Sequence, residues 1–109
     1  MSLAERRKGA AAEREAIALI RRAGWPNARR TSDGRAQIGR GDVADGPAGV
    51  HLEIKRQERL NVPGALAQVR ADSDAQDVPV LVHRPSRSGW MATLPLPDLL
   101  DLLALRERE

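Results

Sequence analysis

Two acidic residues and a lysine lie close together in the middle of the sequence, in a pattern suited to phosphodiester chemistry. Asp42 follows Gly41, and the tripeptide Glu53-Ile54-Lys55 begins 11 positions after Asp42. Carboxylates are the oxygen ligands that Mg²⁺ prefers. An ammonium group can orient a water or offset charge on a phosphate. These residue types predict metal-assisted hydrolysis, although a Glu-x-Lys on a strand surface is more often only solvated charge.

The element that positions Glu53 and Lys55 is predicted to be a β-strand over residues 50–55. Its hydrophobic residues, at positions 50, 52 and 54, share one face, and His51, Glu53 and Lys55 share the other. We expect His51 to be a surface or DNA-facing residue, with a role as general base as the alternative. Asp42 follows a glycine-rich stretch and is expected where another strand starts or bends.

A third acid, Glu13, lies on a predicted first helix over residues 4–23, which lacks proline and ends before Gly24. At about 100° per residue, Ile17 and Ile20 project within about 40° of Glu13. Glu13 therefore lies at the centre of the apolar face of this helix. A carboxylate turned into a core is costly unless it has a partner. We expect either a metal site or an ion pair with a neighbouring arginine.

Length and composition indicate one domain over residues 1–109, with no disulfide framework and no cysteine-based zinc site. The chain contains no cysteine and only two histidines, His51 and His83. We expect His83, at the end of an apolar strand, to be structural. No apolar run is long enough to span a membrane and no signal peptide is recognisable, so we expect a soluble, cytoplasmic protein.

Positive charge is concentrated in the first part of the chain. Residues 1–40 hold ten Lys or Arg and four acids, a net charge of +6, whereas the remaining residues sum to −3. Of the eighteen basic residues only Lys8 and Lys55 are lysines. Arginine-rich surfaces suit bidentate phosphate contacts and favour nucleic acid as the partner. The alternative is the codon bias of a high-GC genome.

The other segments predict an α/β fold, a mixed β-sheet flanked by helices in the order α-β-β-β-α-β-β-α. Both tryptophans, Trp25 and Trp90, are expected in the core. A glycine-rich basic loop over residues 32–41 is expected between the first two strands. The remaining elements are expected to be strands over 27–31, from 42, over 79–83 and over 90–94, and helices over 62–74 and 96–105.

Several motifs, in their order along the chain, resemble the archaeal-type Holliday junction resolvases of the PD-(D/E)xK nuclease superfamily. The resemblance spans about residues 7–94 and implies a restriction-endonuclease-like fold. The Leu-rich C-terminal segment has no counterpart in it. The matching motifs are Arg7-Lys8-Gly9-Ala10-Ala11-Ala12-Glu13-Arg14-Glu15, the helix end at Gly24-Trp25, Gly41-Asp42, Leu52-Glu53-Ile54-Lys55 and Gly89-Trp90.

This resemblance implies roles for the site residues. Glu13, Asp42 and Glu53 would be metal-site acids, with the main-chain carbonyl of Ile54 as a further ligand. Lys55 would be the catalytic lysine. The expected cofactor is Mg²⁺, with Mn²⁺ able to substitute.

The resemblance also implies a substrate and an assembly. A symmetric homodimer would nick two strands of a four-way DNA junction in the cytoplasm of a prokaryotic cell or a phage-infected host. The open alternatives are a restriction-like or nicking endonuclease on duplex DNA and a non-catalytic DNA-binding module. The residues expected to contact DNA are Arg6, Arg7, Lys8, Arg14, Arg29, Arg30, Arg35 and Arg40.

Overall fold

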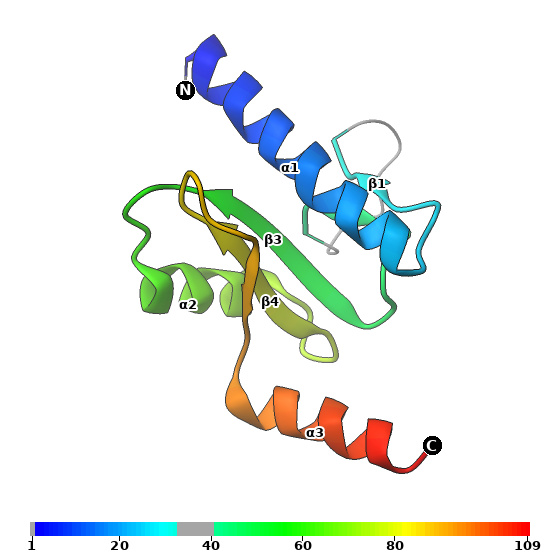
Figure 1. Cartoon of the computed structure of the whole chain (residues 1–109). Helices are drawn as coiled ribbons and strands as arrows, with labels where there is room; N and C mark the ends of the chain where they lie inside the picture. Colours follow the sequence, from blue (N-terminus) through cyan, green and yellow to red (C-terminus); the bar gives the residue numbers. More distant parts are fainter. Residues whose placement is uncertain (1, 33–40) are drawn as a thin grey trace.

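The computed structural model describes residues 2–32 and 41–109 and shows an α/β fold with helices and mixed sheets (Figure 1). The coarse α/β prediction is therefore confirmed. The expected loop residues Arg35 and Arg40 lie outside the described residues. In chain order the elements are α1 (Leu3–Ala23), β1 (Arg29–Arg30), β2 (Val43–Ala44), β3 (Val50–Arg56), α2 (Val62–Asp72), β4 (Val78–Arg84), β5 (Met91–Thr93) and α3 (Leu96–Glu107).

The main sheet has the order β3-β4-β5, with β3 parallel to β4 and β4 antiparallel to β5. Helix α2 makes the crossover that a parallel pair requires. The short strands β1 and β2 pair antiparallel in a second sheet. Strand β3 therefore lies at an edge of the main sheet, and among residues 2–32 and 41–109 only Gly41, through one bridge to Leu52, extends the pairing beyond it. At this edge, residues from both faces of β3 can line the same cavity.

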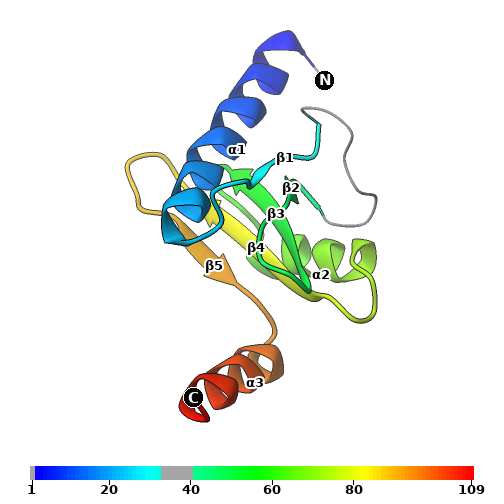
Figure 2. The same ribbon diagram turned by 90° about the vertical axis from the view of Figure 1, so that its right-hand side faces the viewer.

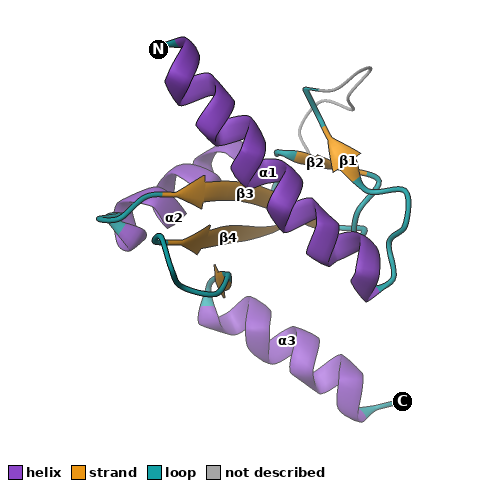
Figure 3. Ribbon diagram, turned by 45° about the horizontal axis from the view of Figure 1, so that its top comes forward, coloured by secondary structure: helices purple, strands orange, loops and turns teal. Residues whose placement is uncertain are grey.

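Helix α1 packs across β3, as Figure 3 shows. Its N-terminus is capped by the Ser2 side chain, which accepts a hydrogen bond from the Glu5 N–H at 3.1 Å. Gly24 ends the helix with a φ of 137°, a value that favours glycine. The predicted apolar face is the one that packs inward, since Ala16 and Ile17 are buried in the core.

The core lies between α1 and one face of the main sheet. The predicted alternation of β3 is observed: Leu52 and Ile54 are buried beneath α1, with Val50 packed beside them. Helix α2 covers the opposite face, where Leu81 and Val69 are fully buried (Figure 2). The polar residues of β3 thus lie on the α2 side of the sheet.

Two expectations about single residues are wrong. His51 is not at the surface, because only 3% of it is exposed. Trp25 is not in the core, because it is 40% exposed. Glu15 is exposed on α1, where it pairs with Arg84 Nη2 at 2.7 Å and accepts a hydrogen bond from Trp90 Nε1 at 2.9 Å. These contacts tie α1 to the β4–β5 side of the sheet.

Candidate functional site

Asp42 is held against the free edge of β3 by two hydrogen bonds. Its main-chain N–H donates to the Leu52 carbonyl, and its Oδ2 accepts from the Ile54 N–H, both at 2.7 Å. Gly41 makes this approach possible, because its φ is 73° and a Cβ there would collide with the Leu52 carbonyl oxygen. The same Cβ would lie 3.0 Å from the ring of His51. The Gly-Asp pair is therefore a structural requirement of this edge.

Glu13 reaches the site from α1 and is paired with an arginine. Its Oε2 accepts from Arg30 Nε at 3.0 Å and from Arg30 Nη2 at 2.9 Å. The two side chains are only 17% and 13% exposed. This is the ion pair that the sequence left open as an alternative to a metal site. It accounts for the burial of the Glu13 charge.

Burial, and to a lesser extent a neighbouring carboxylate, raises the pKa of two acids of the site, Asp42 and Glu13. Burial is the main cause that raises the pKa of Asp42 from its usual 3.8 to about 6. The charge of Glu53 raises it further, and the hydrogen bond from Ile54 opposes the shift. Burial and the charge of Asp42 also raise the pKa of Glu13, against the effect of Arg30. Burial of these carboxylates is therefore the main feature that a bound cation could offset.

Glu53 is held by the histidine two residues before it. His51 Nε2 lies 3.2 Å from Glu53 Oε1, and an ionised carboxylate can only accept, so Nε2 is the donor. His51 is buried, whereas Glu53 is partly exposed. Since its ring is covered and its Nε2 is committed to Glu53, the geometry favours an orienting role over that of a general base.

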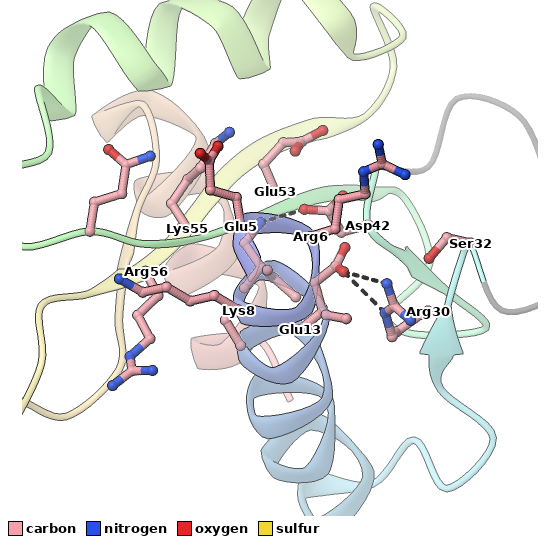
Figure 4. A pocket seen from close by; sticks show the side chains of 15 residues that line it. Glu5, Arg6, Lys8, Glu13, Arg30, Ser32, Asp42, Glu53, Lys55 and Arg56 are labelled. Atoms are coloured by element: carbon pink, nitrogen blue, oxygen red, sulfur yellow. Dashed lines mark hydrogen bonds and ion pairs between the residues drawn. The ribbon is translucent and has the colours of Figure 1, made fainter. Parts of the chain in front are cut away.

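One cavity of about 650 Å³ brings the sequence-predicted site residues together (Figure 4). Glu13 approaches it from α1, Asp42 from the segment before β2, and Glu53 from β3. Ile54 and the exposed Lys55 also line it. Four lining residues that the sequence reasoning did not single out are Glu5, Ser32, Arg56 and Gln57.

A sequence pattern could have predicted the position of only some of these four residues. Gln57 follows Lys55 by two positions, so the alternation of β3 extended past its end places both on one side. No sequence pattern places Ser32 or Arg56 at the cavity, because their positions depend on how β1 and β3 pack.

The residues predicted to contact DNA are divided among several environments. Arg6 and Lys8 line the cavity, whereas Arg7 and Arg14 are exposed on α1. Arg30 also lines the cavity, but its guanidinium is engaged with Glu13. Arg29 Nε pairs with Asp45 Oδ2 at 3.2 Å. The role of all these residues in binding DNA stays a prediction.

The donor chemistry of the site fits a hard divalent cation. Two carboxylates, from Asp42 and Glu53, and a main-chain carbonyl, from Ile54, are oxygen donors, and burial, together with the charge of Glu53, raises the pKa of Asp42. Within residues 2–32 and 41–109, no three acidic, histidine or cysteine side chains form a ready metal-binding group. Mg²⁺ does not need one, because it commonly takes one or two carboxylates and keeps several waters.

Comparison with known proteins gives no relative for this chain. No family model, no curated protein and no solved structure matches it. None of the helices in the described part of the chain is long and apolar enough to cross a membrane.

Proposed function

We propose that this chain is a Mg²⁺-dependent endodeoxyribonuclease of the PD-(D/E)xK superfamily that nicks four-way DNA junctions as a homodimer. The observation that carries the proposal is the convergence of Glu13, Asp42, Glu53 and Lys55 on one cavity. These residues are up to 42 positions apart in sequence, and they come from α1, the segment before β2, and β3. A solvated Glu-x-Lys on a strand surface gives no reason for the other two acids to lie beside it.

The arrangement of elements supports the same proposal. A helix, three strands, a crossover helix and two further strands follow one another, with the Glu-x-Lys on the third strand. We infer a restriction-endonuclease-like fold from this order together with the motifs. Edge strand β3 presents the tripeptide beside Asp42, where a phosphate can approach from solvent.

Asp42, Glu53 and the carbonyl of Ile54 are the groups that would hold Mg²⁺, with Mn²⁺ as a substitute. When bound, the cation supplies Lewis acidity, which lowers the pKa of a water and polarises the phosphate. The chain's own contribution is orientation: the Ile54 N–H fixes Asp42, and His51 fixes Glu53. Lys55 lines the same cavity, where its ammonium can position the attacking water and offset charge on the phosphate.

Basic residues supply the electrostatic attraction for DNA. Arg6 and Lys8 lie at the cavity, and exposed Arg7 and Arg14 continue the positive charge along α1. We infer that the DNA backbone lies along α1 and enters the cavity beside β3. A duplex-cutting restriction-like or nicking enzyme would use the same site, so the junction preference rests on the resemblance alone.

The decisive experiment compares cleavage of a four-way junction with cleavage of a linear duplex of identical sequence, each with Mg²⁺ and with EDTA. We expect Mg²⁺-dependent nicking of the junction, and a loss of about 100-fold or more in Glu53→Ala. Glu58→Ala is the matched control, because Glu58 is exposed and bonds the Ser86 N–H outside the cavity. Full activity in Glu53→Ala would refute the site, and equal cleavage of both substrates would favour the duplex-cutting alternative.

A non-catalytic DNA-binding module is the second candidate, and the Glu13–Arg30 ion pair favours it. That pair neutralises Glu13 without any metal. Calorimetric titration with Mg²⁺ separates the two proposals. The nuclease is expected to take up the ion with a measurable heat that Asp42→Asn abolishes, and the module is expected to give no such heat.

A further inference from the structure

A second cavity, of about 420 Å³, adjoins the candidate active site at the edge of β3. Glu53, Lys55 and Gln57 line both cavities. Residues of α1 bound the first cavity and residues of α2 bound the second, and the side chains of Glu53 and Lys55 lie between these two helices (Figure 4). A ligand whose phosphate is held in the first cavity can therefore extend into the second.

The second cavity differs from the first in the charge of its lining. Its formal charges cancel, because it is lined by two acids, Glu53 and Asp72, and by two cations, Lys55 and Arg59. A lining without net positive charge does not attract a second phosphate, and the Asp72 carboxylate would repel one. The occupant that this charge balance suits is an uncharged group.

The walls of the second cavity combine apolar surface with a carboxamide. Leu60, Ala65 and Val69 line it, and each of them is at least partly buried. Gln68 Nε2 donates to Asp72 Oδ1 at 3.0 Å, which leaves the second N–H and the carbonyl oxygen of Gln68 to bind a ligand. A glutamine carboxamide can pair with N7 and the 6-amino group of adenine. Apolar surface beside such a group suits an unstacked nucleobase.

We propose that the second cavity binds one unpaired nucleobase, adenine best, while a phosphate next to that base lies in the first cavity. The inference rests on the proposed function, because it takes DNA as the ligand. A base inside a duplex must lose its pairing and stacking before it can enter, whereas a base that is already unpaired loses much less. The second cavity therefore favours DNA with a bulge or an open branch point over a fully paired duplex.

Binding of three linear DNAs of otherwise identical sequence tests the proposal. One is fully paired, one carries a single unpaired adenine, and one carries an abasic nucleotide in place of that adenine. Fluorescence anisotropy in EDTA measures binding without cleavage. The wild-type chain is expected to bind the adenine bulge about tenfold or more tightly than the other two DNAs. The abasic bulge keeps the extra phosphate and the interrupted helix, so the comparison isolates the base.

A pair of matched substitutions on α2 tests the location. Ala65→Leu narrows the cavity and is expected to bind both bulges equally. Ala67→Leu is the control, because Ala67 is exposed, lies about 200° around the helix from Ala65 and does not line the cavity. It is expected to keep the preference for the adenine bulge. Circular dichroism checks that each variant folds. If Ala65→Leu does not fold, Gln68→Ala, at an exposed position, replaces it and is expected to lose most of the preference.

The outcomes separate this inference from the nuclease proposal. Equal wild-type affinity for the two bulges overturns the base site and leaves the nuclease proposal to the cleavage experiment. An equal preference in folded Ala65→Leu and Ala67→Leu, or an undiminished one in Gln68→Ala, overturns it as well. Failure to bind any of the three DNAs overturns it together with the proposed function. A preference for the adenine bulge without any cleavage supports the base site on a non-catalytic DNA-binding module.

Discussion

At the scale of single residues, Asp42 sets how the stability of the metal-free protein depends on pH. The pKa of Asp42 is raised in the folded state to about 6, chiefly by burial. The folded state therefore binds the proton more tightly than the unfolded state, and this contribution to stability is lost as pH rises from about 4 to 6. At neutral pH, where Asp42 is ionised, its burial therefore lowers the stability of the native state.

Asp42→Asn is expected to remove this pH dependence. An asparagine can still accept from the Ile54 N–H, but it carries no charge. In EDTA, the variant should gain about 2 kcal/mol relative to wild type between pH 4.5 and pH 7.5. Urea unfolding at the two pH values measures this. Asp45→Asn, at an exposed acid three positions on, should show no such gain. An Asp42→Asn variant whose relative stability is the same at both pH values would contradict the expectation.

His51 is expected to act on catalysis by orienting Glu53. Removal of the Nε2 donor in His51→Ala frees the carboxylate, so kcat should fall about tenfold or more while KM for DNA changes little. His51→Gln, which retains a donor, should recover part of the loss. His83→Ala is the control: His83 is also buried, on the neighbouring strand in register with Lys55, and its Nε2 bonds Thr93. Equal losses of kcat in both alanine variants would show that His51 is only a packing residue.

At the scale of elements, the site depends on how closely the segment before β2 approaches β3. Gly41→Ala is expected to disturb this contact, because the new Cβ meets the Leu52 carbonyl and the His51 ring. Gly49→Ala separates the two effects of the substitution. Gly49 has nearly the same φ, 74°, but no atom would lie within 4 Å of its Cβ. Gly49→Ala should carry only the backbone cost of about 1 kcal/mol.

Gly41→Ala should lose about 1–2 kcal/mol more than Gly49→Ala in urea unfolding, and it should lose nuclease activity as well. The loss of activity is expected because Asp42 moves with Gly41. Equal stability and activity in the two variants would show that the approach to β3 is not required.

The features of these elements that the sequence could predict are those that depend on residues within a single helix or strand. Period-two alternation identified the buried face of β3, and the helical period placed Glu13 on the packed face of α1. Contacts between distant segments carried no local signal. Arg30 as the partner of Glu13, and the Arg84–Trp90 pair that binds Glu15, depend on how α1 lies across the sheet. The burial of His51 depends on the approach of Gly41, which no periodicity reveals.

At the scale of the whole molecule, the charge asymmetry of the sequence has a counterpart in space. Of the basic residues of α1, Arg6 and Lys8 line the cavity, and Arg7 and Arg14 are exposed on the same helix. Helix α2 lies on the other face of the sheet (Figure 2). Removal of one positive charge from α1 should therefore weaken DNA binding, whereas removal of one from α2 should not. Arg14, exposed on α1, and Arg70, exposed on α2, offer a comparison in which net charge changes equally.

Arg14→Ala is expected to weaken DNA binding and reduce its salt dependence. Each phosphate contact contributes about −0.9 to the slope of log K against log salt for duplex DNA, so the slope should become shallower by about 1. Fluorescence anisotropy with a labelled junction in EDTA, at a series of salt concentrations, measures binding without cleavage. Arg70→Ala should leave the slope unchanged, because its charge lies on the far face of the sheet. If both variants reduced the slope equally, the affinity would reflect overall net charge, and DNA would have no preferred path along α1.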